Sequence, residues 1–598
     1  MDTSIKYIPY QQDGEPKRRA AVTNVDVDLD GLSEREIQIL GHLIDAANGM
    51  NAIFRDQFER LTVALSDFVS LLMHVADKNE VEKLENYLTV LDIQNGPYSL
   101  LPRKNHLLDI SEDRIRELAE KAEIQNDIDI NPLVKLLIKG VETPDKANFY
   151  PEDITDDELK ALEDGKLVNS SVVRDTDGDL HVVYNEDRYY ESLKPVIAHL
   201  RKARDLTPDT GFRLYLDAKI LELETGTDEA RRIADYTWVR HNYDLDIVIS
   251  TALEVYLDNY RNFRGAASGG VYLKNDAAEE LLTSLIKEVP YWEKNAPWKY
   301  KKEEIDPETL PKLKFVDVLT WAGDYVTGPF TTIAQSLPND EWVGKNIGTV
   351  NMVYMNTGRA SHTISGNLAA EEFLGKREVS KVKDVLFDAN QLHSALHEIG
   401  HTTGRQSSEA SDGQPSDYIE EEYSFLEETR AELFGLFALK KLVEEGVIDQ
   451  TMSDACYDGM LITMIMSMKF DPVQAHNKAR NGMFHYFEEM GIVERFQEGG
   501  KEKFAIIHDK AHSVVCEMLA TVANIKAHGK KNEAIALREK YVYSDPMKDN
   551  VESRTADFPL GRGLIFPSLK KDNSAYYPVL EYPEKFSDQE KFKIRIED

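Results

Sequence analysis

Residues 392–404 read LHSALHEIGHTTG, and this stretch places three histidines at four-residue intervals. His393, His397 and His401 would share one face of an α-helix, because residues four apart lie one turn apart. Three imidazoles stacked in this way fit poorly around one small cation. The spacing therefore indicates a helix on which two histidines act together and the third has a different task.

The segment from His397 to His401 forms an HExxH pattern. On a helix this pattern directs two imidazoles at one cation, and the glutamate after the first histidine, Glu398, reaches a metal-bound water. The alternative interpretation is a pair of partly buried helix histidines without a metal.

A third ligand is expected downstream, and residues 427–432, EETRAE, supply candidates. Glu428 and Glu432 share a helix face with a core-like stripe of glycine and leucine. Carboxylates on a buried face need a cation or hydrogen-bond partners, although acids that merely solvate a helix edge remain the alternative. Two histidines and one carboxylate leave a position open for water, which is typical of catalytic zinc. Iron oxygenases use the same ligand types, but not normally from HExxH on one helix. We therefore expect one Zn²⁺ ion.

The position of Glu398 distinguishes the three histidines. Glu398 directly follows His397, so it can serve the water only if His397 is the first ligand and His401 the second. The EETRAE helix then completes the site and leaves no vacancy for His393. We expect His393 to be a packed residue or to contact the ligands from outside.

Composition indicates a large globular protein and excludes some partners. The 598 residues allow two or more lobes, and 42% hydrophobic with 30% charged residues fits a soluble chain. The formal net charge of -35 argues against nucleic acid and anionic membranes, although solvation of helix faces is its simplest explanation. We expect neither a nucleic-acid nor a membrane partner, and nothing in the sequence bears on the oligomeric state.

The chain has two cysteines, Cys456 and Cys516, which exclude a disulfide framework and a cysteine-based metal site. Its N-terminus lacks the apolar region of a signal peptide, although a processed chain would look the same. The longest apolar run, MLITMIMSM, is too short to span a bilayer. We therefore expect a cytoplasmic protein.

Periodicity outlines the organisation of the chain. Ser33 and Ser111 precede acidic first turns, which are typical of helix starts. Helices are expected at 33–47, 111–124, 276–289 and 418–446. Alternation around a TDGD turn predicts a β-hairpin at 166–185, and strands are expected at 244–250 and near the end of 264–275. Residues 402–417 have the composition of a linker. The first half thus predicts a mixed α/β lobe and the second a mainly helical one.

The HEIGH and EETRAE motifs together resemble the dipeptidyl peptidase III family of zinc metallopeptidases, which carry an HExxGH helix and an EExxAE helix. Other segments resemble family segments in the same order: DNYRN at 258–262, DVLTWAG at 317–323, SLPND at 336–340, KNIGTVN from Lys345 and QAHNKAR from Gln474. The resemblance spans roughly residues 246–480, with a weaker echo at RGLIFPSLK from Arg562.

The resemblance implies a zinc site and its base. His397, His401 and Glu428 would bind the zinc, and Glu398 would be the general base on the zinc water. Metal-assisted peptide hydrolysis needs a Lewis acid, a base and donors where negative charge develops.

It also implies supporting roles. His476 and Tyr260 would polarise the scissile carbonyl and stabilise the oxyanion, although taken alone they would be ordinary packed or capping residues. Glu427 and Glu432 would orient the zinc histidines from outside. By the same resemblance, Asp258, Ser336 and Asn339 would accept hydrogen bonds from the free N-terminus of a peptide.

The fold implied by the resemblance is α+β and predominantly α, with two lobes on either side of a cleft. The mixed lower lobe, with a small five-stranded β-barrel, would comprise residues 1–277, 317–368 and 556–598. The helical, zinc-binding upper lobe would comprise residues 278–316 and 369–555. Closure of the lobes over a peptide would exclude water from the reaction.

The chain departs from the family pattern in several places. Its HExxH motif has five residues where the family usually has six, and the five-residue form suits a regular helix. Asp258 and Ser336 stand where a glutamate and an asparagine are usual. The spacer from His401 to Glu428 is shorter than the family pattern, and we expect the family's terminal helical segment with a substrate-binding arginine to be missing.

The function expected from these features is release of N-terminal dipeptides from short peptides. One alternative is a zinc exo- or oligopeptidase that cuts elsewhere. Another is an inactive, peptidase-like binding protein, which is disfavoured because the base, the ligands and the oxyanion donors are all present.

Overall fold

The computed structural model describes most of the chain. The described residues are 5–14, 17–98, 104–124, 129–141, 148–162, 168–257, 263–299, 312–326, 332, 334–404, 418–544, 546–559, 561–572 and 575–582. The fold is α+β and predominantly helical, as expected. It consists of two compact units. Unit 1 comprises Met1–Asn275, Lys312–Ser361 and Pro559–Asp598, and unit 2 comprises Asp276–Pro311 and His362–Phe558.

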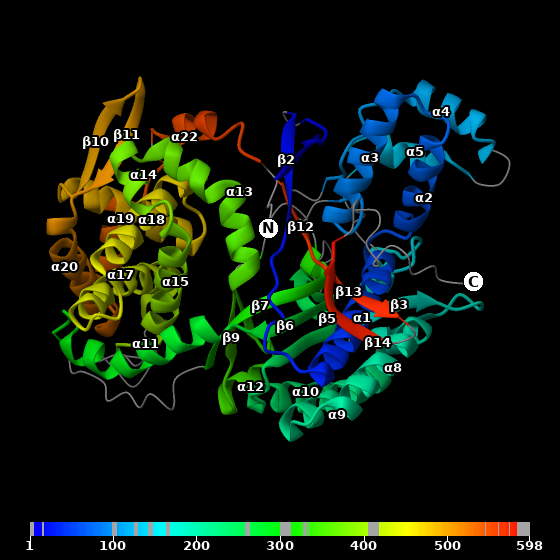
Figure 1. The fold of residues 1–598 in the computed structure, drawn as a ribbon, viewed down its shortest axis with the longest axis horizontal. Coiled ribbons are helices and arrows are strands. Elements are labelled where there is room, and N and C mark those ends of the chain that lie inside the picture. Colours follow the sequence, from blue (N-terminus) through cyan, green and yellow to red (C-terminus); the bar gives the residue numbers. More distant parts are fainter. Residues whose placement is uncertain are drawn as a thin grey trace. The chain divides into compact units, whose positions relative to one another are not determined.

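Unit 1 is built on a five-stranded sheet (Figure 1). Its strands are, in spatial order, β5 (Leu245–Leu257), β6 (Phe263–Lys274), β7 (Lys312–Gly323), β9 (Val350–Tyr354) and β8 (Ala334–Leu337). All neighbours pair antiparallel except β7 and β9, which are parallel. The sheet curls into a half-barrel, and in the described part of the chain β5 and β8 form its two edges.

Helix α1 (Glu34–Phe58) covers this sheet and packs against β5, β6 and β7. It starts at a capping box, in which the Ser33 side chain accepts from the Glu36 backbone and the Glu36 side chain accepts from Ser33. A Cβ at Gly269 of β6 would lie 2.9 Å from the Ala47 backbone, so only glycine allows the helix to approach this closely. Helices α8 (Tyr190–Leu206), α9 (Thr210–Thr225) and α10 (Asp228–Arg240) complete the same core.

The four helices that follow α1 form a core of their own. They are α2 (Thr62–Met73), α3 (Lys78–Ile93), α4 (Glu112–Lys121) and α5 (Asn131–Ile138). Beside α3 lies a small sheet in which β2 (Arg18–Asn24) pairs antiparallel with β1 (Lys6–Tyr10) and parallel with β12 (Gly561–Ile565). The hairpin of β13 (Ser568–Asp572) and β14 (Ala575–Glu581) also returns to unit 1, where β14 contacts α1.

Three short helices and a hairpin complete unit 1. The helices are α6 (Asp156–Lys160), α7 (Asn185–Arg188) and α12 (Glu341–Asn346). Strands β3 (Ser170–Arg174) and β4 (Leu180–Tyr184) pair antiparallel, which confirms the hairpin predicted from the TDGD turn.

Unit 2 is a helical assembly around α17 (Tyr423–Glu444), which packs against α15 (Leu386–Thr402), α18 (Gln450–Ser467), α19 (Ala475–Glu489) and α20 (His508–Ala527). Around them lie α11 (Asp276–Asn295), α14 (Lys376–Val382), α21 (Lys531–Tyr541), α22 (Lys548–Arg554) and the hairpin of β10 (Val493–Glu498) and β11 (Lys501–Ile506). Helix α13 (Met355–Phe373) begins in unit 1 and continues into unit 2.

The helices and strands expected from periodicity are confirmed, with shifted ends. The helix expected at 418–446 begins at Tyr423, after a 3-10 turn at Glu420–Glu422. Ser33 caps its helix as predicted, whereas Ser111 makes no side-chain hydrogen bond to the helix that follows it. Of the linker expected at 402–417, residues 405–417 lie outside the described residues.

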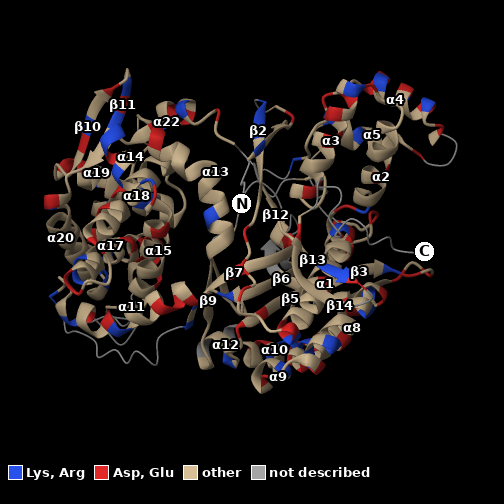
Figure 2. Cartoon of the chain, in the orientation of Figure 1, with Lys and Arg blue, Asp and Glu red and all other residues tan. Residues whose placement is uncertain are grey.

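Charged residues are interspersed along the helices of both units (Figure 2). This mixture of signs agrees with solvation of helix faces as the reason for the acidic composition. None of the described helices combines the length and apolar character needed to cross a membrane.

A buried histidine makes the stability of unit 1 depend on pH. The ring of His106 lies between Tyr10 and Tyr87, with ring centroids 5.1 and 5.3 Å away. Burial lowers the pKa of His106 to about 4, although a hydrogen bond with the Gln11 backbone opposes this. In the unfolded chain the imidazole takes up a proton near its ordinary pKa of about 6.5. The contribution of the neutral, buried His106 to the free energy of unfolding is therefore complete above about pH 6.5 and is lost as the pH falls towards about 4.

We therefore predict that a His106→Gln variant loses less stability in acid than the unsubstituted protein. Between about pH 7.5 and about pH 5 the difference should be about 2 kcal/mol. Hydrogen exchange of the α3 amides at the two pH values measures it. A His74→Gln variant, which replaces an exposed histidine of the same unit, is the control. Equal acid sensitivity of the His106→Gln variant and the unsubstituted protein would contradict the prediction.

Candidate metal centre

Helices α15 and α17 can approach each other closely because small residues lie between them. A Cβ at Gly400 of α15 would lie 3.2 Å from the Cα of Ala431 on α17. A Cβ at Gly435 of α17 would lie 2.8 Å from Nε2 of His393 on α15. The absence of side chains at these two positions brings the HExxH face of α15 against the EETRAE face of α17.

The three predicted ligands converge at this contact. Nε2 of His397 lies 3.1 Å from Nε2 of His401 and 3.3 Å from Oε2 of Glu428. The third distance, from His401 Nε2 to Glu428 Oε2, is 3.7 Å. Ligand atoms about 2.0–2.1 Å from a tetrahedral zinc ion are about 3.3 Å apart, so the three separations fit such a site.

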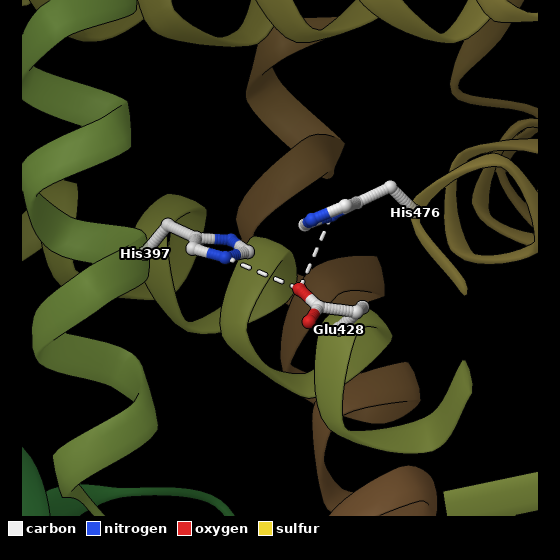
Figure 3. Close-up of side chains that lie close together, drawn as sticks. All are labelled: His397, Glu428 and His476. Carbon is white, nitrogen blue, oxygen red and sulfur yellow. Dashed lines mark ion pairs between the residues drawn. The ribbon is translucent and has the colours of Figure 1, made fainter. Parts of the chain in front are cut away.

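His476, from the first turn of α19, reaches the same point (Figure 3). Its Nδ1 lies 3.2 Å from Glu428 Oε2. His397, Glu428 and His476 thus form a second possible ligand group, whose ligand atoms all lie within 4.8 Å of one another. The sequence predicts a different role for His476, polarisation of the substrate carbonyl, and the geometry places it beside the ligands.

The residues present fit a bound cation. Oε2 of Glu428 is buried and makes no well-directed hydrogen bond, although three imidazoles surround it. Burial alone would lower the pKa of His397, but Glu428 and Glu432 raise it to about 10. A position at which the local field favours positive charge so strongly also favours a metal ion. The cluster of histidines and a glutamate could therefore hold a metal.

Glu427 holds the outer nitrogen of His401. Its Oε1 lies 2.9 Å from His401 Nδ1 and also accepts from Arg430 Nη2 at 2.6 Å. Its Oε2 accepts from Arg430 Nε at 3.0 Å and lies 2.7 Å from Lys526 Nζ. Burial would raise the pKa of the Glu427 carboxyl, but Arg430, His401 and Lys526 hold it well below its usual range. An ionised Glu427 orients the His401 ring through Nδ1, so that Nε2 faces His397 and Glu428.

Glu432 occupies the corresponding place at His397. Its Oε2 lies 3.4 Å from His397 Nδ1, and its Oε1 accepts a hydrogen bond of 3.1 Å from Arg480 Nε. His393, the first histidine of the ladder, packs against the same residue. Nε2 of His393 lies 3.1 Å from the Glu432 carbonyl oxygen, and its Nδ1 lies 3.7 Å from Oε2. The structure thus places His393 outside the ligand cluster, against the carboxylate that orients His397.

Glu398, the predicted base, follows His397 on α15 and is partly exposed. Its carboxylate is close enough to contribute to the raised pKa of His397, after the effects of burial, Glu428 and Glu432. It therefore adds to the negative field around the cluster.

The predicted peptide-binding residues belong to unit 1. Ser336 is exposed on the edge strand β8, where it pairs with Asn351 of β9. Asn339 is exposed as well, and its Nδ2 donates to the Leu253 carbonyl oxygen at 3.1 Å. Asp258 and Tyr260 lie outside the described residues.

Sequence reasoning missed the cations that accompany the carboxylates. Arg430 lies inside EETRAE and Arg480 inside QAHNKAR, so their motifs provided a signal for both. Lys526 lies on α20, far from any motif, and only the packing of α20 on α17 reveals its contact with Glu427.

Comparison with known proteins finds similar sequences and similar folds. The chain is 25% identical over 596 residues to the protein named Nudix hydrolase 3 of Arabidopsis thaliana. The alignment covers 92% of this chain and 74% of that protein. The fold of this chain is similar to that of dipeptidyl peptidase III from Caldithrix abyssi, with a TM-score of 0.72 and 22% identity. The superposition covers 91% of this chain and 97% of the other. The enzyme from Corallococcus sp. strain EGB gives a TM-score of 0.62 at 22% identity, covering 91% and 94%.

A family model described as peptidase family M49 matches residues 161–434, which include both metal-site helix motifs. This part of the chain therefore resembles peptidase family M49. The match confirms the resemblance inferred from HEIGH and EETRAE, and it supports a peptidase.

The close contact between α15 and α17 predicts a coupling that can be measured. A Gly435→Ala substitution adds a methyl group 2.8 Å from His393 Nε2, so it should cost more stability when His393 is present than in a His393→Ala background. The expected difference is about 1–2 kcal/mol, obtained from thermal unfolding of the two single variants and the double variant. Additive effects would contradict the packing described here.

Proposed function

We propose that this protein is a zinc-dependent peptidase of family M49 that releases N-terminal dipeptides from short peptides. The observation that carries the proposal is the convergence of His397, His401 and Glu428, whose ligand atoms lie 3.1–3.7 Å apart. The proposal includes one Zn²⁺ ion, short peptides as substrates and a cytoplasmic location.

His401 is a better candidate than His476 for the third metal ligand. The side chain of His476 is 52% exposed, whereas that of His401 is 28% exposed and is oriented by Glu427. A ligand held in a fixed orientation loses less conformational entropy on binding a metal. His476 then remains free to donate a hydrogen bond to a substrate oxygen beside Glu428.

The proposed mechanism assigns a task to each residue. A bound zinc ion would supply Lewis-acid polarisation of the peptide carbonyl and of a water molecule. The Glu398 carboxylate accepts the proton of the attacking water and passes it to the leaving amine. His476 donates to the carbonyl oxygen as negative charge develops there, and we infer the same role for Tyr260.

The proposal also specifies the position of the cut, which is the release of dipeptides. It is supported by the motif resemblance and by the similarity of the fold to structures named dipeptidyl peptidase III. It requires acceptors for the free amine of a peptide, for which the proposed residues are Asp258, Ser336 and Asn339. A zinc exo- or oligopeptidase with another cut and an inactive binding protein are the alternatives.

The general-base role predicts the behaviour of a Glu398→Gln variant. Its kcat should fall by about 10²–10⁴, because a neutral amide cannot accept the proton of water. Zinc content should stay near one ion per chain, since the three ligands are unchanged. Metal analysis and peptide-hydrolysis rates measure the two quantities. If the variant keeps the activity of the unsubstituted protein, Glu398 is not the base.

Product analysis tests the position of the cut. A panel of peptides of roughly four to eight residues, incubated with the zinc-loaded protein, should lose N-terminal dipeptides and nothing else, as read by mass spectrometry. N-acetylated copies of the same peptides are the control and should resist cleavage, because their amines are blocked. Single-residue release or internal cuts would replace the dipeptidyl proposal with the exo- or oligopeptidase alternative. Zinc binding with no cleavage of any peptide would favour the inactive binding protein.

A further inference from the structure

Lys526 is a buried lysine whose charged ammonium group is unfavourable in the interior of the protein. It lies on α20 and is 3% exposed. Its ammonium has an ion pair with Glu427, at 2.7 Å, and lies 5.7 Å from the centroid of the Tyr423 ring. No well-directed hydrogen bond to it occurs among the described residues. Burial of an ammonium group costs several kcal/mol, so the contact with Glu427 carries almost all of the compensation.

Glu427 does not need Lys526 to neutralise its charge. Arg430 is fully buried and already binds both of its oxygens, at 2.6 and 3.0 Å. Lys526 approaches Oε2 from a different helix, α20. Its contribution is therefore geometric, because a carboxylate held from two directions cannot rotate about its last bond without breaking a charged contact.

The held carboxylate faces the more exposed of the two HExxH histidines. The side chain of His401 is 28% exposed and that of His397 is 10% exposed. Packing therefore restrains the His401 ring less than the His397 ring. The orientation of His401 depends more on the hydrogen bond of 2.9 Å between its Nδ1 and Glu427 Oε1. Glu432, beside the better buried His397, has one arginine partner, Arg480, where Glu427 has an arginine and a lysine.

We propose that Lys526 is a positioning residue of the metal centre, which acts through Glu427 to keep Nε2 of His401 turned towards the metal. This inference rests on the proposed function, because it takes His401 as a zinc ligand. It assigns to α20 a part in metal binding that no ligand motif contains.

The test is the zinc affinity of Lys526→Met, measured by competition with a chromophoric chelator. The affinity should fall about tenfold, the lower end of the range for residues that orient a ligand from outside. A Lys526→Arg variant should recover it to within about threefold, because it keeps the charge beside Oε2. In a Glu427→Gln background, Lys526→Met should cause no further loss, since the residue it acts through is already changed.

A Lys503→Met variant is the matched control. Lys503 is another buried lysine of unit 2, 8% exposed, and its ammonium donates to the carbonyl oxygens of Glu371 and Glu372. Its replacement should lower the melting temperature and leave the zinc affinity unchanged.

Two results would overturn the inference. One is a folded Lys526→Met protein, as judged by circular dichroism, with unchanged zinc affinity. The other is the same loss of affinity in the Glu427→Gln background as in the unsubstituted protein, because Lys526 would then act independently of Glu427. Both leave the proposed function intact if the unsubstituted protein binds zinc and cleaves peptides. Failure of the unsubstituted protein to bind zinc would overturn the proposed function itself.

Discussion

The candidate site depends on the close contact between α15 and α17. Gly400 and Gly435 remove the side chains that would hold these helices apart, and the contact places the carboxylate of Glu428 between the imidazoles of α15. Although imidazole nitrogens lie near it, the buried Oε2 of Glu428 makes no well-directed hydrogen bond. A buried carboxylate oxygen without a hydrogen bond is unfavourable. A cation at this point would resolve the conflict between packing and polarity.

A second layer of charges holds the first in place. Each histidine of HExxH has a carboxylate at its outer nitrogen, Glu427 is paired with two buried cations, and Glu432 is paired with one half-buried cation. This alternation orients both rings so that their Nε2 atoms face Glu428. The cations come from α17, α19 and α20, so the precise orientation of the ligands depends on the tertiary packing of unit 2 and not on α15 alone.

The sequence was informative where a motif is local and silent where contacts are distant. The ligand helices could be predicted because i, i+4 spacing alone places His397 and His401 on one face. Lys526 could not, because nothing near it in the chain marks its contact with Glu427. The half-barrel order of β5 to β8 and the parallel pairing of Gly561 with Ala20 likewise join distant segments, which periodicity does not describe. The position of His476 beside Glu428 also required the packing of α19 on α17.

The most direct test of the central claim is a crystal structure of the zinc-soaked protein with anomalous diffraction measured at the zinc edge. We expect one ion, bound by Nε2 of His397, Nε2 of His401 and Oε2 of Glu428, with Nδ1 of His401 still hydrogen-bonded to Glu427. An ion bound by His397, Glu428 and His476 with His401 turned away would contradict the assignment of ligands. An absence of ordered zinc between α15 and α17 would contradict the metal centre altogether.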